Sequence, residues 1–223
     1  MLNYLFFLVI YFVLTIALIQ NENDFIEELS IDNNQISLII DSTIIINENI
    51  TLPSTLKILS FIGNSQSTSK LTFNYPIYFN ENIEEIEIKN IEIIGTLDFY
   101  NTKRITLENV VLNGSIVIDM DDHHHNEYIK FNKVIYRPIK NQIYLYCIDL
   151  KGNVIINDSK LYGGSCQRLL NYNGLEKYSL NIKNTYFSGE YQCPCLSITQ
   201  SKNVNIEYSD FEKGFSEKGM DGG

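Results

Sequence analysis

The sequence of 223 residues contains no tryptophan and a single alanine, Ala17. Because alanine is the strongest helix former, a chain with almost none of it is not expected to be mainly helical. Basic residues are also scarce: 17 lysines and arginines stand against 27 acidic residues, and the formal net charge is -10. Nucleic-acid binding is therefore not expected, and a polyanionic substrate is disfavoured unless a cation bridges the charges. The content of 44% hydrophobic and 20% charged residues is that of a globular protein.

The first twenty residues carry no charged side chain, and residues 5–19 are almost continuously apolar. This pattern predicts a secretory signal peptide over residues 1–20, with Thr15-Ile16-Ala17 as a small-x-small cleavage site. The alternative is an uncleaved signal anchor, because about 20 apolar residues are enough to cross a bilayer. Either reading directs the rest of the chain into the secretory pathway, to the extracellular space or the cell surface. A membrane contact is expected only if this segment is not cleaved.

Three Asn-x-Ser/Thr sequences, at Asn49, Asn113 and Asn157, are candidate N-glycosylation sites in a secreted chain. A chain rich in asparagine and serine also produces such sequences by chance. The four cysteines are an even number, and in an oxidising compartment at least one disulfide is expected. Cys193-Pro194-Cys195 has the form of a zinc knuckle, but the chain has no second pair of this kind, so zinc is not expected.

Six segments of the chain share one apolar template, which indicates an internal repeat. Their central residues lie 19 to 26 residues apart and are Ile88, Leu107, Phe131, Ile156, Ile182 and Ile206. The position two residues before each of them is always Ile, Val or Leu, and the position five residues after is always apolar or tyrosine. The position seven residues after is Gly or Pro in five of the six copies.

The spacing within the template predicts short strands joined by corners. The first two apolar positions share one face of a strand, because side chains alternate. Asn90, Asn109, Asp158 and Asn184 then occupy a corner position, where Asn and Asp tolerate a left-handed backbone. A second strand follows and ends at the Gly or Pro. Such units bury their apolar faces only by stacking, so we predict a parallel β-helix with about 24 residues per repeat. A β-sandwich would explain the alternation but not the fixed columns.

The columns resemble the right-handed parallel β-helix of the pectin-lyase-like superfamily, over residues 24–223. Residues 24–29 are expected to form a short amphipathic helix that covers the first repeat, as in that superfamily. The early, less regular strands are expected within residues 36–40, 42–46, 55–62 and 71–79. The predicted organisation is therefore a signal segment at 1–20, a cap helix at 21–30 and an all-β helix at 31–223.

The C-terminal sequence resembles a narrower group of proteins. Residues 209–214 and Asp221-Gly222-Gly223 resemble the Phe-x-x-Asn and Gly-Gly-Ala-Ile repeat of polymorphic outer-membrane proteins and adhesin-like β-helices, with Gly214 where the repeat prefers Asn. The abundance of Ile and Asn is similar to that of secreted β-helix proteins of anaerobic gut fungi. Because the sequence stops inside a recognisable repeat, we expect either an incomplete C-terminal end or end-to-end self-association.

The polysaccharide-degrading enzymes of this superfamily use sequence motifs that the chain lacks. Galacturonan hydrolases carry Gly-His-Gly and Arg-x-Lys, and neither occurs here. Asp121-Asp122 lies in a connection between two repeats. Pectate lyases need an arginine near a cluster of aspartates, and none of the three arginines of this chain occupies an outward position near such a cluster. No catalytic, cofactor-binding or metal-binding residue is therefore predicted. His123, His124 and His125 could bind zinc or copper, but consecutive loop residues rarely converge on one metal, which favours a solvated loop.

Three surface features complete the candidates. An aromatic strip for stacking sugar rings is considered for Tyr144, Tyr146, Tyr162, Tyr172, Tyr186 and Tyr191, against the alternative that tyrosine is simply a good strand former. Glu84, Glu85, Glu87 and Glu92 are interpreted as a solvated outer face. Cys166 and Cys193 fall at near-equivalent positions of adjacent repeats, within disulfide reach, so we predict that they pair. The partners of Cys147 and Cys195 stay open.

Together these features predict a secreted or cell-surface β-helix module that is adhesin-like or structural and not catalytic. Its expected partner is a carbohydrate or a cell-wall surface. The alternative is a polysaccharide-active enzyme, a lyase or glycoside hydrolase, with its groove on an outer strand face.

Overall fold

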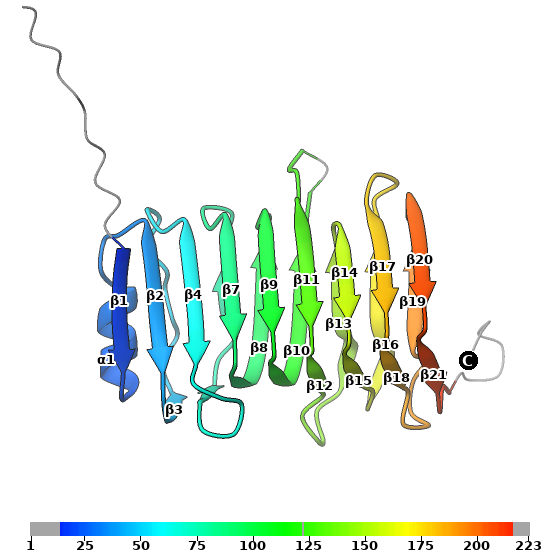
Figure 1. Ribbon diagram of the computed structural model, residues 1–223, viewed down its shortest axis with the longest axis horizontal. Helices are drawn as coiled ribbons and strands as arrows, with labels where there is room; N and C mark the ends of the chain where they lie inside the picture. The colour runs from blue at the N-terminus through cyan, green and yellow to red at the C-terminus, as the bar shows by residue number, and fades with distance from the viewer. Residues whose placement is uncertain (1–13, 122, 216–223) are drawn as a thin grey trace, which may run out of the picture.

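The computed structural model describes residues 14–121 and 123–215. Within them, almost all regular structure is parallel β, stacked as a solenoid of about eight turns of about 24 residues. Figure 1 shows the strands of one sheet side by side along the long axis, with successive turns of the chain at each step. The predicted parallel β-helix is thereby confirmed. We call one turn of the solenoid a rung.

The first strand of each rung belongs to one sheet of nine strands. These are β1 (Leu14–Ile19), β2 (Gln35–Ile40), β4 (Ile58–Gly63), β7 (Glu85–Lys89), β9 (Arg104–Glu108), β11 (Tyr128–Asn132), β14 (Val154–Asn157), β17 (Ser179–Lys183) and β20 (Asn203–Glu207).

The second and third strands of the rungs together form a sheet of twelve strands. The second strands are β3 (Thr43–Ile46), β5 (Lys70–Phe73), β12 (Ile135–Arg137), β15 (Lys160–Tyr162), β18 (Tyr186–Ser188) and β21 (Asp210–Glu212). The third strands are β6 (Ile77–Phe79), β13 (Tyr144–Lys151), β16 (Cys166–Asn173) and β19 (Leu196–Thr199). Two longer strands, β8 (Glu92–Tyr100) and β10 (Val111–Asp119), run through both positions.

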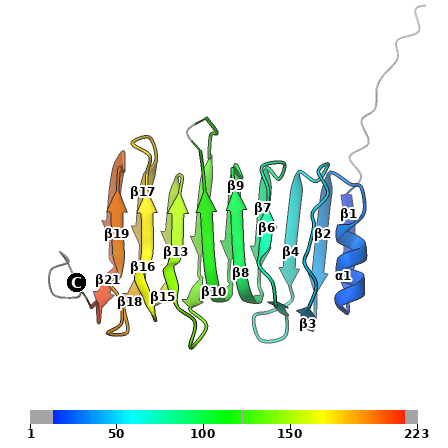
Figure 2. The ribbon, with the colours of Figure 1, turned by 180° about the vertical axis from the view of Figure 1, so that it is seen from behind.

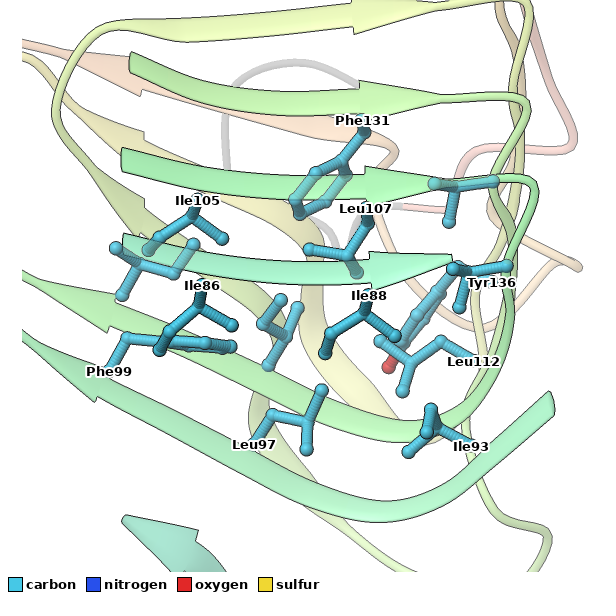
Figure 3. Packing of buried hydrophobic residues seen from close by; sticks show 14 of the residues in the cluster. Ile86, Ile88, Ile93, Leu97, Phe99, Ile105, Leu107, Leu112, Phe131 and Tyr136 are labelled. Carbon is cyan, nitrogen blue, oxygen red and sulfur yellow. The ribbon is translucent and has the colours of Figure 1, made fainter. Parts of the chain in front are cut away.

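The apolar columns read from the sequence are the columns of the core. Ile88 pairs with Leu107, and the same register continues without a shift through Phe131 and Ile156 to the last rung. The column of the second strand is equally regular from Ile93 onward. Figure 3 shows side chains of both columns pointing into the interior between the strands. The core is therefore a continuous stack of like residues, each covered by its equivalents above and below.

The first corner of each rung has the left-handed backbone that the sequence predicts. Asn90, Asn109, Asp158 and Asn184 all have φ between 49° and 54°. Lys133 and Tyr208 occupy the same position with φ of 55° and 50°, although neither lysine nor tyrosine favours a left-handed backbone. The asparagines also bond to one another along the stack, as in the 2.8 Å contact from Asn109 Nδ2 to Asn90 Oδ1.

The second corner differs from the prediction. Gly95 and Gly114 do not end their strands but turn β8 and β10 through the corner, with φ of 136° and 153°. A side chain at Gly114 would lie 1.8 Å from the Gly95 carbonyl oxygen, so only glycine fits there. In the next three rungs the strand is interrupted at this corner by residues 138–143, 163–165 and 189–195.

The N-terminal end of the core is closed by helix α1 (Glu22–Leu29), as predicted. Asn21 caps the helix by accepting a hydrogen bond from the Asp24 backbone N–H at 3.1 Å. The Phe25 ring lies 5.7 Å from that of Phe61 and 5.9 Å from that of Phe73, inside the first rungs. Strand β1, which the sequence places in the predicted signal segment, pairs in parallel with β2, and residues 1–13 lie outside the described part.

The last described rung, β20 and β21, is exposed: Val204 and Phe211 keep 45% and 42% of their surface in solvent. The Phe211 ring stacks on Phe187 at 4.6 Å. The Asp221-Gly222-Gly223 sequence lies outside the described residues. Within residues 14–121 and 123–215, no helix has the length and apolarity to cross a membrane.

Candidate functional site

The third strands of successive rungs lie side by side in one sheet, from β6 and β8 to β19 (Figure 2), and the side of this sheet away from the core is an outer face of the solenoid. On β8 the side chains alternate: Leu97 and Phe99 are fully buried, whereas Asp98 and Tyr100 point outward. Figure 3 shows Leu97 and Phe99 on the core side of their strand. Because the rungs are in register, the outward residues of neighbouring strands line up in columns.

Two of these columns bring tyrosines and carboxylates together. Tyr78 pairs with Asp98, which pairs with Val117, which in turn is followed in register by Asp149. In the neighbouring column, Tyr100 pairs with Asp119. Tyr78 and Tyr100 are 59% and 43% exposed. We call Tyr78, Asp98, Tyr100, Asp119 and Asp149 the tyrosine–carboxylate face.

The carboxylates of this face differ in their partners. Asp119 Oδ1 accepts a 2.7 Å hydrogen bond from Lys151 Nζ, and Asp149 Oδ1 accepts one of 2.8 Å from Asn171 Nδ2. Asp98 has neither a hydrogen-bond donor nor a cation in contact among the described residues. Its carboxylate is therefore free to accept hydrogen bonds from a ligand.

Partial burial shifts the ionisation of two of these carboxylates. Burial raises the pKa of Asp98 above its ordinary value, and repulsion from Asp119 raises it further. Burial also raises the pKa of Asp149, although the Asn171 hydrogen bond and Lys151 oppose the shift. Both groups thus hold protons more tightly than free aspartate does.

The face has the chemistry of a sugar-binding surface. The flat sides of exposed tyrosine rings pack against the C–H faces of pyranose rings, and carboxylate oxygens accept hydrogen bonds from hydroxyl groups. The three aspartates disfavour an anionic ligand, because among the described residues of these columns Lys151 alone opposes their charge.

A hollow lies at the second corner of the later rungs. It has a volume of about 460 Å³ and is lined by Ile143, Leu145, Cys166, Arg168 and Phe215 among others. Ile143 and Leu145 are 90% and 61% exposed, so the rim of this hollow is apolar. The interruptions at residues 138–143, 163–165 and 189–195 create it.

The predicted cysteine pair is brought together at this hollow. The sulfur atoms of Cys166 and Cys193 lie 3.3 Å apart, on neighbouring rungs, and both are thiols in this structure. Cys147 and Cys195 flank β16 from opposite sides, on β13 and beside β19. The structure therefore brings the two predicted partners into contact and keeps Cys147 and Cys195 two rungs apart.

The predicted tyrosine strip does not form as one surface. Tyr172 is fully buried and its hydroxyl donates to the Gly152 carbonyl at 3.0 Å. Tyr162 and Tyr186 lie on the second strands with ring centroids 5.9 Å apart, and Arg137 lies over the Tyr162 ring at 4.6 Å. The remaining three belong elsewhere: Tyr144 and Tyr146 lie on β13 and Tyr191 in the loop 189–195.

The histidine run lies in the connection between β10 and β11. His124 Nδ1 is 2.7 Å from Asp121 Oδ1, which also accepts hydrogen bonds from the backbone N–H groups of His123 and His124. These contacts, the His124 ring first, lower the pKa of Asp121. Across residues 14–121 and 123–215, no group of three or more His, Cys, Asp or Glu side chains is arranged to hold a metal.

The acidic residues of the outer face are paired rather than isolated. Glu84 contacts Lys103 at 3.0 Å, and Glu85 contacts Arg104 at 2.8 Å across neighbouring rungs. Glu87 and Glu92 have lysine partners of their own. The hydrogen bond from Lys103 is the largest cause that lowers the pKa of Glu84. The patch is a series of half-buried ion pairs along the stack.

The three candidate glycosylation sites differ in their exposure and in the contacts of their side chains. Asn49 is exposed in the loop after β3. Asn113 lies within β10, and its Nδ2 donates to Glu92 Oε1 at 2.8 Å. The hydroxyl of Ser159, which completes the Asn157 sequence, is part of a buried residue that accepts from the Val134 N–H. A glycan on Asn113 would cost the hydrogen bond to Glu92, whereas the exposed Asn49 side chain carries no such cost.

Comparison with known protein families, curated proteins and solved structures finds no match to this chain. The tyrosine–carboxylate face was missed in the sequence because its members belong to different rungs. The signal that could have found it is the alternation Leu97-Asp98-Phe99-Tyr100, which marks a strand with an aromatic and a carboxylate on its outer side.

Proposed function

We propose that this chain is an extracellular or cell-surface β-helix module that binds neutral carbohydrate without catalysis. The observation that carries the proposal is the tyrosine–carboxylate face, where Tyr78 and Tyr100 stand exposed beside the unpartnered Asp98. A solenoid presents such a face as a long rigid surface, which suits an extended polymer. The proposed role is adhesin-like, with the module holding a cell-wall or cell-surface glycan.

The preference for a neutral glycan follows from charge. A uronate would approach three aspartates with one lysine in contact, Lys151, and would need a bridging cation. A neutral polymer has no such cost, and its hydroxyl groups are the donors that a carboxylate accepts. The net charge of -10 adds to the repulsion of acidic polymers.

The cellular setting is part of the same proposal. The apolar residues 1–20 support entry into the secretory pathway, and an uncleaved form would be held at a membrane. The regular apolar columns support a place in the pectin-lyase-like superfamily, with a right-handed stack.

A polysaccharide-active enzyme is the second candidate, and one observation favours it. Asp98 and Asp149 both have raised pKa values and lie two rungs apart on one outer face. With rungs about 4.8 Å apart, their separation is on the order of 10 Å. An inverting glycosidase places its acid and base about 6.5–9.5 Å apart, with a proton-holding carboxyl on one side.

The proposal is tested by binding of the full chain to insoluble neutral polysaccharides (cellulose, xylan, mixed-linkage glucan and chitin) and to polygalacturonate. We expect retention on at least one neutral polymer and none on polygalacturonate without calcium. Tyr78→Ala and Tyr100→Ala should each weaken binding about tenfold, as expected for truncation of a central aromatic contact.

Tyr191→Ala is the matched control, because Tyr191 is 71% exposed but lies in the loop 189–195, away from the face. Its binding should equal that of the unchanged chain. Equal losses in all three variants, or no retention on any polymer, would rule out the proposed face. Release of reducing ends that Asp98→Asn abolishes would instead establish the enzyme.

A further inference from the structure

All four cysteines gather at the second corner of three successive rungs. Cys147 and Cys166 lie near the start of the third strands β13 and β16, and Cys193 and Cys195 lie in the loop 189–195 before β19. In the earlier rungs, β8 and β10 pass this corner without interruption. The loops that open the corner are therefore the same segments that bring the sulfur atoms together.

Cys166 is the centre of this group. Its sulfur lies 3.3 Å from that of Cys193 on one side, and on the other side Cys147 lies on the neighbouring strand β13 and is the first cause of the raised pKa of the Cys166 thiol. Cys195 is not in this chain of contacts, because its thiol donates to the Glu212 carbonyl at 3.4 Å. Three thiols from three rungs thus stand in the order Cys147, Cys166, Cys193.

The surroundings hold the Cys166 and Cys193 sulfurs in place. The backbone N–H of Cys166 donates to the Gly164 carbonyl at 2.8 Å, and that of Cys193 donates to the Gly189 carbonyl at 3.2 Å. A side chain at Gly163 would come within 2.7 Å of the Cys193 sulfur, so this glycine leaves the space that the sulfur fills.

The three thiols differ in access. Cys147 and Cys193 are fully buried, whereas Cys166 is partly exposed and lines the hollow of about 460 Å³. A dissolved disulfide can therefore reach Cys166 first. Arg168, which lines the same hollow, makes no ion pair within the described residues and attracts an anionic reagent.

We propose that Cys166 and Cys193 are a disulfide-forming site in which Cys166 reacts first with a small-molecule disulfide, Cys193 closes the bond, and Cys147 is the alternative partner of Cys166. In the cell this chemistry rests on the oxidising compartment of the proposed function. In solution it does not depend on glycan binding, so the two proposals fail separately.

The reaction with oxidised glutathione balances in two exchanges. The Cys166 thiol, whose pKa is raised to about 12, gives its proton to solvent and attacks one glutathione sulfur as the thiolate. A Cys166–glutathione bond forms, the glutathione disulfide bond breaks, and the first glutathione leaves as a thiolate that takes up a proton from solvent. The Cys193 thiolate then attacks the Cys166 sulfur, the Cys166–Cys193 bond forms, and the second glutathione leaves and is protonated. Two protein thiols are oxidised and one glutathione disulfide is reduced to two thiols.

The bond would tie the start of β16 to the loop 189–195 and so fix one wall of the hollow, where Gln192 and Pro194 also lie. It closes a chain segment of 27 residues. A cross-link of this length should raise the melting temperature by about 7–14 °C, because it restricts the unfolded chain.

The test uses the full chain, reduced and then equilibrated in a glutathione buffer rich in the oxidised form. Free thiols are trapped with N-ethylmaleimide in denaturant, so that the buried thiols also react, and are mapped by peptide mass spectrometry. We expect two alkylated cysteines, Cys147 and Cys195, a Cys166–Cys193 peptide, and the rise in melting temperature. Four alkylated cysteines, or a cross-link that contains Cys195, would overturn the proposal.

Two variants separate the roles of the thiols. Cys195→Ser is the matched control and should leave the Cys166–Cys193 cross-link and its melting shift unchanged. Cys193→Ser should redirect oxidation to a Cys147–Cys166 cross-link. A lasting glutathione adduct on Cys166 in that variant would show that Cys147 is not an alternative partner.

Discussion

Tyr136 occupies the core column in the rung that follows β10, where the strand is interrupted at the second corner by residues 138–143. Its ring stands between Leu112 and Leu161, and its hydroxyl lies 2.6 Å from the Gly114 carbonyl oxygen and 3.0 Å from that of Cys147. Gly114 falls between the residues of β10 that pair with β12 and those that pair with β13. The hydroxyl therefore replaces a backbone partner that the next rung does not supply.

Replacing Tyr136 by phenylalanine should destabilise the fold by about 1–3 kcal/mol, because it keeps the ring but leaves these buried carbonyls without their donor. Burial raises the pKa of Tyr136 well above its ordinary value, so the hydroxyl is protonated at neutral pH and donates. For a domain of this size, the expected decrease in melting temperature is about 2–12 °C.

The measurement is thermal unfolding followed by circular dichroism, with urea unfolding as a second probe. The matched control is Tyr100→Phe, because Tyr100 is 43% exposed and its hydroxyl makes no hydrogen bond within the described residues. The control should melt with the unchanged protein. If Tyr136→Phe also does so, the hydroxyl does not replace a missing partner at the corner, and this account of the core is wrong.

Three further predictions concern the corners and the outer surface. Lys133→Asn should stabilise the fold by about 0.5–1 kcal/mol in thermal unfolding, because Lys133 has a φ of 55° that asparagine tolerates better; a loss of stability would contradict this. The pKa of Asp98 is higher in the folded protein than the value of 3.8 in the unfolded chain. The stabilisation that comes with this shift is therefore fully present below pH 3.8, and it is lost as the pH rises through the pKa of the folded protein. Asp98→Asn should therefore raise the melting temperature at pH 7 and have no effect below about pH 3; a decrease at pH 7 would refute the burial argument. In a eukaryotic secretory host, the mass lost on enzymatic deglycosylation should decrease in Asn49→Gln and be unchanged in Asn113→Gln, because only the Asn113 amide of these two is engaged in a strand contact.

Much of the fold could be predicted from the sequence because the core obeys local rules. A residue that must face inward on a strand has to be apolar, and equivalent residues must recur once per rung. The columns through Ile88 and Ile93 were therefore readable, as was the left-handed corner at Asn90. The prediction of corners from residue type failed at Lys133. Pairing with the neighbouring rungs forces a left-handed backbone there, although lysine does not favour that conformation.

The second corner was harder to predict. A glycine indicates freedom of the backbone but not whether the strand stops or continues. At Gly114 the strand continues through the corner and stays paired with the neighbouring rung. The Gly95 backbone lies so close there that only a residue without a side chain fits. The third strand of each rung was consequently missed, and with it the tyrosine–carboxylate face that it carries.

Four features were predictable from the order of residues alone: the parallel stack, its repeat of about 24 residues, the cap helix and the adjacency of Cys166 and Cys193. These depend on burial and spacing, which leave a period in the chain. The folded stack was needed to place Tyr78, Asp98 and Asp149 on one surface and to place Cys147 on the strand beside that of Cys166. Residues that point outward are not constrained by packing, so their type does not recur once per rung. The connections between rungs also vary in length. The neighbours of outward residues are set only when the whole stack comes into register.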